Sequence, residues 1–203
     1  MAFGLFFCAL GIVVKIKANI GYAPWDVFNV GLSKTFGFSI GFSNTLVGIV
    51  IVIIVLFFRE RIGFGTVSNM LFIGIIIDII LHANIIKTPN NPIFNYLMLI
   101  IGLFITSIGT YLYISSAFGA GPRDSLMVIL TKKTKIPVGV CRSIIELIVT
   151  IVGGLLGGMV GIGTIISVVG LGFCIQVTFK IFRFDVKSIK HESFYDTLRD
   201  KRK

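Results

Sequence analysis

Six long apolar stretches alternate with short polar segments along this 203-residue chain. They cover about 3–19, 41–58, 66–82, 94–117, 138–157 and 164–182. A membrane-spanning helix needs about 20 mainly apolar residues, within a range of about 17–25, and every stretch meets that length. The pattern therefore predicts an all-α membrane protein with about six transmembrane helices and no room for a separate soluble domain.

The chain also contains an internal repeat. When the sequence is displaced by 98 positions, residues 4–82 align with residues 102–180 without a gap, and seven of the identical pairs are glycines. Glycine and proline control backbone geometry, so the two copies are expected to share a fold. Three spans per copy is an odd number, which predicts that the second copy is inverted in the membrane. The predicted organisation is repeat one at 1–88, repeat two at 89–182 and a basic tail at 183–203.

The distribution of basic residues predicts the orientation. Lys and Arg gather on the cytoplasmic side of membrane proteins. With both termini in the cytoplasm, 15 of the 19 basic residues lie on the inner side and 4 on the outer side. We therefore expect a multi-pass protein of a bacterial inner membrane with both termini cytoplasmic. The net charge of +10 is explained by this asymmetry and by a tail near anionic lipid headgroups, without nucleic acid as a partner.

Each copy carries a G-x-x-P-x-D element between its first two spans. Gly21, Pro24 and Asp26 match Gly119, Pro122 and Asp124. Proline at the first helical position, followed by an acid, indicates a helix start. The short amphipathic helices that follow, to about residues 36 and 134, are either interfacial or re-entrant. If they are re-entrant, the two carboxylates face a polar cavity suited to a cation, a proton or an amine; otherwise they cap helices at the membrane surface.

A second shared element precedes the third span of each copy. Its glycines are expected to form tight turns and its threonines to act as helix N-caps. It lacks the lysine of a phosphate-binding loop. The residues concerned are Gly63, Gly65 and Thr66 in repeat one and Gly161, Gly163 and Thr164 in repeat two.

Two acids interrupt apolar spans without being repeated. Glu146 follows Arg142 by four residues, and Asp78 precedes His82 by four, which is the spacing of neighbours on one helix face. Charges inside a membrane are costly and usually face the bundle interior or water. The two acids therefore belong either to a substrate or ion path, or to charged pairs near helix ends whose head groups reach the interface.

The sequence contains little that suggests catalysis. Cys8, Cys141 and Cys174 lie in apolar spans without metal-site spacing, and the two histidines form no catalytic set. We therefore expect no catalytic residues, no metal, no cofactor and no enzymatic activity.

The motifs resemble the YczE/YitT-type family of bacterial integral membrane proteins, closer to the YczE branch. The resemblance rests on Gly21-Tyr22-Ala23-Pro24-Trp25-Asp26-Val27, on Gly41, on Gly63-Phe64-Gly65-Thr66 and on Asp78, and it extends to about residue 182. It implies a polytopic inner-membrane protein and no particular substrate. The start departs from the longer, basic N-terminus usual in that family, and the first helix is expected to be clipped.

Two functions remain open from the sequence. The first is a small secondary transporter or permeation protein for a small solute or cation, either as a monomer or as a homodimer, with the repeated Asp26 and Asp124 in its path. The second is a non-transporting membrane accessory or scaffold protein that acts through its basic tail.

Overall fold

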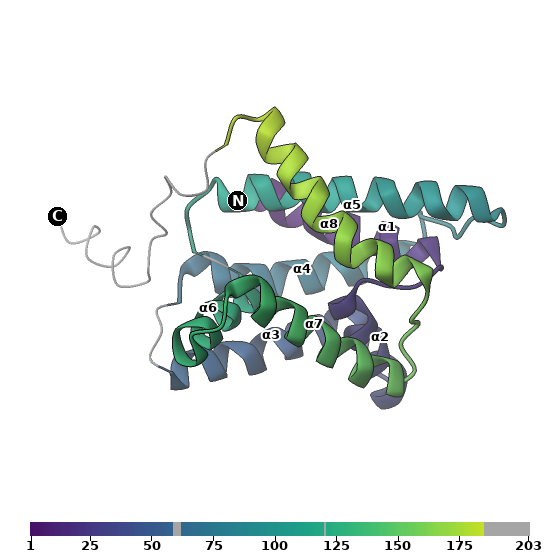
Figure 1. Ribbon diagram of the computed structural model, residues 1–203. Helices are drawn as coiled ribbons and strands as arrows, with labels where there is room; N and C mark the ends of the chain where they lie inside the picture. Colours follow the sequence, from purple (N-terminus) through teal and green to yellow (C-terminus); the bar gives the residue numbers. More distant parts are fainter. Residues whose placement is uncertain (59–61, 120, 185–203) are drawn as a thin grey trace.

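The structure is a computed structural model that describes residues 1–58, 62–119 and 121–184, and over these ranges it is all-helical (Figure 1). In chain order the helices are α1 (Ala2–Ala18), α2 (Pro24–Phe36), α3 (Ile40–Phe57), α4 (Phe64–Ala83), α5 (Pro92–Ile114), α6 (Pro122–Thr134), α7 (Val138–Leu155) and α8 (Ile162–Ile181). All but the first two residues of the basic tail predicted at 183–203 lie outside the described residues.

The predicted apolar stretches all form helices, within about three residues of the expected bounds. Five of these helices, α3, α4, α5, α7 and α8, are long and apolar enough to cross a membrane. α1 has 17 residues and is shorter than these five, so five candidate spans are observed where six were predicted. The short helices expected after the two G-x-x-P-x-D elements are α2 and α6, which have 13 residues each.

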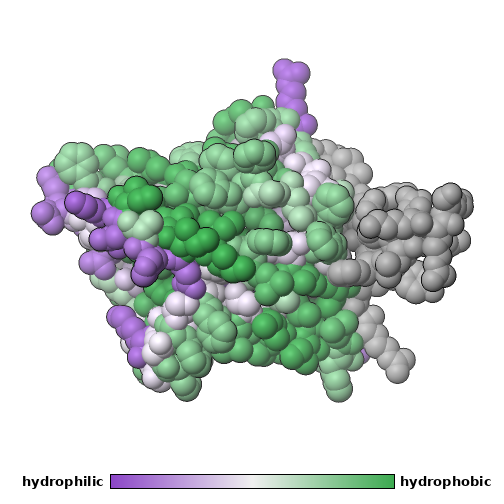
Figure 2. Space-filling view, turned by 180° about the vertical axis from the view of Figure 1, so that it is seen from behind, coloured by the Kyte–Doolittle hydropathy of each residue, from purple (hydrophilic) through white to green (hydrophobic). Residues whose placement is uncertain are grey.

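The outer surface of the bundle is strongly apolar. Phe57 and Leu155 are 81% and 83% exposed, and many other large apolar side chains on the candidate spans are also exposed. Figure 2 shows hydrophobic residues across most of one face, with hydrophilic residues gathered toward one end. Such a surface is unfavourable in water and suits lipid chains, so the chain is a multi-pass membrane protein associated with the bilayer.

The core of the bundle is built around α1. Ala9, Val13 and Ala18 are fully buried, and α1 packs along both α5 and α4. The contact with α5 depends on glycines: a Cβ on Gly4 or Gly11 would overlap backbone atoms of α5 near Gly109 and Gly102, respectively. Since the earlier residue of α1 meets the later residue of α5, the two helices are antiparallel.

The helix bounds repeat with the spacing of the sequence. α6, α7 and α8 begin and end 98 residues after α2, α3 and α4. Gly21 and Gly119 both adopt positive φ, of 113° and 117°, a conformation that favours glycine. The two copies therefore share their local backbone geometry.

The turns of the two copies contact each other crosswise. Gly163 N donates to the carbonyl oxygen of Ile20 over 2.8 Å, and Gly65 N donates to that of Phe118 over 2.7 Å. These two hydrogen bonds are equivalent under the 98-residue displacement. Each G-x-x-P-x-D turn thus packs on the glycine turn of the other copy, where only a glycine backbone can approach so closely.

The two shared threonines do not occupy the predicted N-cap positions. α4 and α8 begin earlier than expected, with Gly63 and Gly161 as N-caps, so Thr66 and Thr164 lie at the third helical position. From there the Thr164 hydroxyl accepts a hydrogen bond from Gly161 N at 3.1 Å. The N–H groups of Gly65 and Gly163 lie in the first turn, where they have no intrahelical partner, and they make the crosswise hydrogen bonds instead.

The copies differ in how their last two helices pack. α3 and α4 are in close contact, because a Cβ on Gly41 or Gly74 would overlap the facing backbone carbonyl. The equivalent residues of α7 and α8 are Gly139 and Gly172, and in the described part of the chain no atom lies within 4 Å of a Cβ placed at either. In Figure 1, α7 and α8 diverge from the loop that joins them.

Candidate functional site

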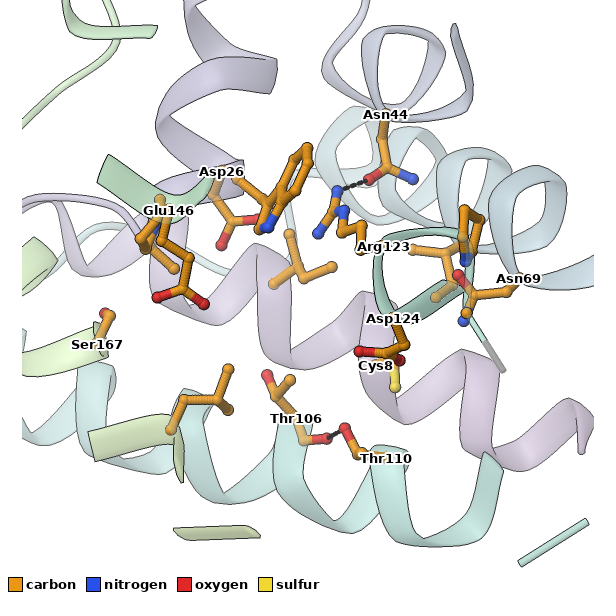
Figure 3. A pocket seen from close by; sticks show the side chains of 18 of the residues that line it. Cys8, Asp26, Asn44, Asn69, Thr106, Thr110, Arg123, Asp124, Glu146 and Ser167 are labelled. Atoms are coloured by element: carbon orange, nitrogen blue, oxygen red, sulfur yellow. Dashed lines mark hydrogen bonds between the residues drawn. The ribbon is translucent and has the colours of Figure 1, made fainter. Parts of the chain in front are cut away.

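A central cavity of about 220 Å³ lies between the helices, and residues of all eight described helices line it (Figure 3). All but three of the lining residues (Lys15, Met127 and Ile175) occur as pairs that are 98 positions apart. The pairs are Cys8/Thr106, Ile12/Thr110, Ala23/Gly121, Pro24/Pro122, Trp25/Arg123, Asp26/Asp124, Asn44/Arg142, Gly48/Glu146, Asn69/Ser167, Met70/Val168 and Ile73/Leu171. The cavity is therefore formed where the two copies meet.

Asp26 forms a buried ion pair in this cavity. Lys15 Nζ lies 3.1 Å from Asp26 Oδ2, and both side chains are 3% exposed. Asp26 is therefore buried between helices and is not exposed on the surface of the protein. Lys15 was not predicted as a site residue; its position in the last turn of an apolar helix, just before an acidic motif, was the available signal.

Arg123 lies near the centre of the cavity and is held by two residues of repeat one. Its Nη2 donates a hydrogen bond to Asn44 Oδ1 over 2.8 Å, and its guanidinium carbon lies 4.7 Å from the ring centroid of Trp25. Asn29 Nδ2 also donates to Asn44 Oδ1, over 3.1 Å, which fixes the amide that receives the arginine. A cation over an aromatic face is attracted by the ring quadrupole. Trp25 and Arg123 are equivalent positions, so this pair joins the two copies.

The predicted pairing of Glu146 with Arg142 is confirmed. Arg142 Nε lies 2.8 Å from Glu146 Oε1, and both residues line the cavity. The repeat-one equivalents are the uncharged Asn44 and Gly48. The second copy therefore contributes an ion pair where the first contributes neutral residues.

The lining of the cavity is buried at Asp26 and Ser167, called here its closed end, and exposed at Asp124, called here its open end. Asp26, Asn44 and Ser167 are buried, with exposed fractions of 3%, 7% and 1%. Their equivalents are more accessible: Asp124 is exposed, Asn69 is half-buried, and the Arg142 side chain is 41% exposed. These three pairs of equivalent lining residues thus differ in their exposure.

Two buried polar atoms at the closed end lack hydrogen bonds. Neither Asp26 Oδ2 nor Ser167 Oγ has a hydrogen-bond partner within the described parts of the chain. The contact of Asp26 Oδ2 with Lys15 is close enough for an ion pair, but it lacks the alignment of a hydrogen bond. Buried polar atoms are normally hydrogen-bonded, so both atoms have unused capacity for a bound group.

The other predicted site residues divide into two groups. Pro24 and Pro122 begin α2 and α6 and line the cavity beside the two aspartates. Asp78 lies outside the cavity, in a hollow it shares with His82. There it accepts hydrogen bonds from Ser39 Oγ at 2.5 Å and from Gly41 N at 2.8 Å, so it stabilises the start of α3.

Comparison with known proteins places these features in a family. Residues 1–180 match a family described as "Family of unknown function (DUF6198)". The chain is 34% identical over 178 residues to the uncharacterized membrane protein YczE of Bacillus subtilis strain 168, covering 85% of this chain and 80% of that protein. It is 30% identical over 176 residues to an uncharacterized protein of Haemophilus influenzae, covering 87% and 80%.

A third relative is the uncharacterized protein YyaS of Bacillus subtilis strain 168, which is 27% identical over 177 residues and is covered to 88% of its length. No solved structure matches the chain. The resemblance to the YczE branch expected from the motifs is confirmed. This chain belongs to the DUF6198 family and is a homologue of the bacterial membrane protein YczE.

Proposed function

We propose that this protein is a small secondary transporter or permeation protein and that the central cavity binds its solute. The observation that carries the proposal is the cavity itself, which the two copies line with equivalent residues that include buried charges. Intramembrane charges are costly to keep without a function. Transporters built from inverted repeats place their sites at the interface between the repeats, close to broken helices. The proposal includes no enzymatic step.

The inverted arrangement is part of this proposal. The antiparallel packing of α1 on α5 supports it, because these helices are equivalent and would run in opposite directions across the membrane. α2 and α6 would then be the short half-helices that bring Asp26 and Asp124 into the interior. With both termini in the cytoplasm, the closed end at Asp26 would face outward and the open end at Asp124 would face the cytoplasm.

The glycines of the last helices support alternating access. Gly139 and Gly172 repeat Gly41 and Gly74, yet no contact described here requires glycine at either position. They would be needed in a second state in which α7 and α8 close on each other as α3 and α4 do here. In that state the open and closed ends of the cavity would be exchanged.

A pair of side-chain hydroxyls at equivalent positions also differs between the two copies. Thr45 Oγ1 donates to the carbonyl oxygen of Met70 over 3.0 Å and joins α3 to α4. Its equivalent, Ser143, donates to Gly139 of its own helix over 3.1 Å. Closure of α7 on α8 would allow Ser143 to form the contact between helices that Thr45 forms in this state.

Accessibility of the cavity tests the proposal without knowledge of the solute. In a chain whose three cysteines are replaced by alanine, Ser167→Cys places a thiol at the closed end. A small membrane-impermeant methanethiosulfonate reagent is expected to label it in inverted vesicles, through the open end, and also in intact cells, through the second state. Ser107→Cys is the matched control, because this serine is equally buried but does not line the cavity, and it should stay unlabelled.

Labelling of Ser167→Cys from one side alone, or from neither, would contradict a transport path. One-sided labelling would favour the accessory or scaffold function. That function rests on a tail that, beyond residue 184, lies outside the described residues.

The sidedness of the copies is a separate prediction. Phe36 and Thr134 are equivalent exposed residues at the ends of α2 and α6. In the cysteine-free chain, Phe36→Cys is expected to react with the impermeant reagent in intact cells, and Thr134→Cys only in inverted vesicles, because the copies are inverted. Reaction of both from the same side would show that the copies are parallel.

A further inference from the structure

The charges of the cavity indicate which class of solute it binds. Three acidic and three basic side chains line it, namely Asp26, Asp124, Glu146, Lys15, Arg123 and Arg142. The two repeated carboxylates alone would favour a cation, but the three basic residues remove that preference. A lone cation or anion would give this low-dielectric interior a net charge, whereas a solute with balanced charges would not.

The cavity also has unused binding capacity of both signs. A guanidinium presents several N–H donors, and among the described residues Arg123 donates a single hydrogen bond, to Asn44. The remaining donors suit a carboxylate, which arginine can bind through two parallel hydrogen bonds. Trp25 and Asn44 hold the guanidinium in place from the opposite copy, so it is oriented before a solute arrives.

Hydrogen-bond acceptors for a positively charged group lie beside the Arg123 guanidinium. In Figure 3 the carboxylates of Asp26 and Glu146 and the hydroxyl of Ser167 lie on one side of the guanidinium, and Asp124 lies apart from them, beside Cys8. Asp26 Oδ2 and Ser167 Oγ are buried and without hydrogen-bond partners in the described residues. An ammonium group here would meet the Ser167 hydroxyl and carboxylate oxygens whose hydrogen-bonding capacity is not filled by the ion pairs with Lys15 and Arg142.

We propose that the solute is a small zwitterion with an ammonium group and a carboxylate, of the size of an amino acid. The carboxylate binds Arg123, the ammonium group binds near Asp26, Glu146 and Ser167, and the uncharged part contacts apolar lining residues such as Ile12 and Ile73. This inference rests on the proposed function and names the substrate class of the same site. The cavity volume of about 220 Å³ limits the solute to a small molecule.

The test compares solutes that share a skeleton and differ in charge. The purified full-length protein in detergent is titrated with leucine, isoamylamine, 4-methylpentanoate and 4-methylpentanamide, and with alanine, ethylamine, propionate and propionamide. The melting temperature and the Kd from calorimetry are measured. In at least one series we expect the zwitterion to raise the melting temperature and to bind about tenfold or more tightly than its three analogues, because only it satisfies both sets of charged hydrogen bonds.

Variants at Arg123 link the binding to the site. Arg123→Gln leaves the cavity with one excess negative charge, so the zwitterion should lose its advantage and the amine should become the best ligand of its series. Arg123→Lys keeps the charge but not the paired donors, and should weaken zwitterion binding without creating a preference for the amine. If Arg123→Gln does not fold, the lysine variant and the wild-type comparison still decide the question.

The outcomes separate this inference from the proposed function. Stronger binding of an amine, a carboxylate or an amide than of the zwitterion, with loss in Arg123→Gln, would overturn the zwitterion class and keep the cavity as a solute site. Absence of binding by both zwitterions would also overturn the class, while two-sided labelling of Ser167→Cys would preserve the transport proposal. Absence of binding together with one-sided labelling would overturn both.

Discussion

Asp26→Ala is expected to destabilise the protein by about 3–5 kcal/mol, because it leaves the Lys15 ammonium group buried without its counter-charge. Both partners are 3% exposed, so the remaining ammonium group is largely removed from bulk water. The free energy of unfolding in mixed micelles, or the melting temperature in detergent, measures the effect.

Two control variants distinguish this explanation from a general effect of mutation. Asp124→Ala changes the equivalent residue, which is exposed, and should cost much less. The double variant Lys15→Met with Asp26→Leu removes both charges and should recover most of the stability, because replacing a whole buried ion pair by apolar residues is often neutral. A double variant as unstable as Asp26→Ala would show that the ion pair is not the reason for the loss.

Gly41→Val and Gly139→Val are expected to have opposite consequences, although the two positions are equivalent. A side chain on Gly41 overlaps the carbonyl oxygen of Gly74, so Gly41→Val should force α3 and α4 apart and cost about 1–3 kcal/mol or more. Gly139 faces open space, and Gly139→Val should leave the melting temperature nearly unchanged. The thermal unfolding of the two variants gives the comparison.

The second part of this prediction concerns access to the cavity. If α7 must close on α8 in the second state, Gly139→Val should abolish labelling of Ser167→Cys in intact cells and leave labelling in inverted vesicles unchanged. Val140→Ala, on the exposed face of the same helix, serves as the control and should alter neither. Retained labelling from both sides in Gly139→Val would contradict the proposed closure.

Local patterns in the sequence predicted the elements well. The length of each apolar stretch, and the proline at the start of α2 and α6, located the helices to within about three residues, because helix length and termination depend on neighbouring residues. The spacing of Arg142 and Glu146 predicted their ion pair, since residues four apart meet on one helix face. The repeat made Asp26 and Asp124 equivalent but left open whether they face a common cavity, and both line the cavity.

What the tertiary structure alone decided is how the two copies meet. The pairing of Lys15 with Asp26, and of Arg123 with Trp25 and Asn44, joins side chains from different helices, so it depends on helix crossings that no local spacing specifies. The difference between Gly41 and Gly139 is also tertiary, because equivalent sequences are packed in one copy and apart in the other. The sequence by itself determined two similar halves, each with helices suited to a membrane. The contacts between those halves formed the cavity and gave equivalent residues different degrees of burial. The reason is that packing across the bundle, rather than local propensity, sets which side chains are buried together.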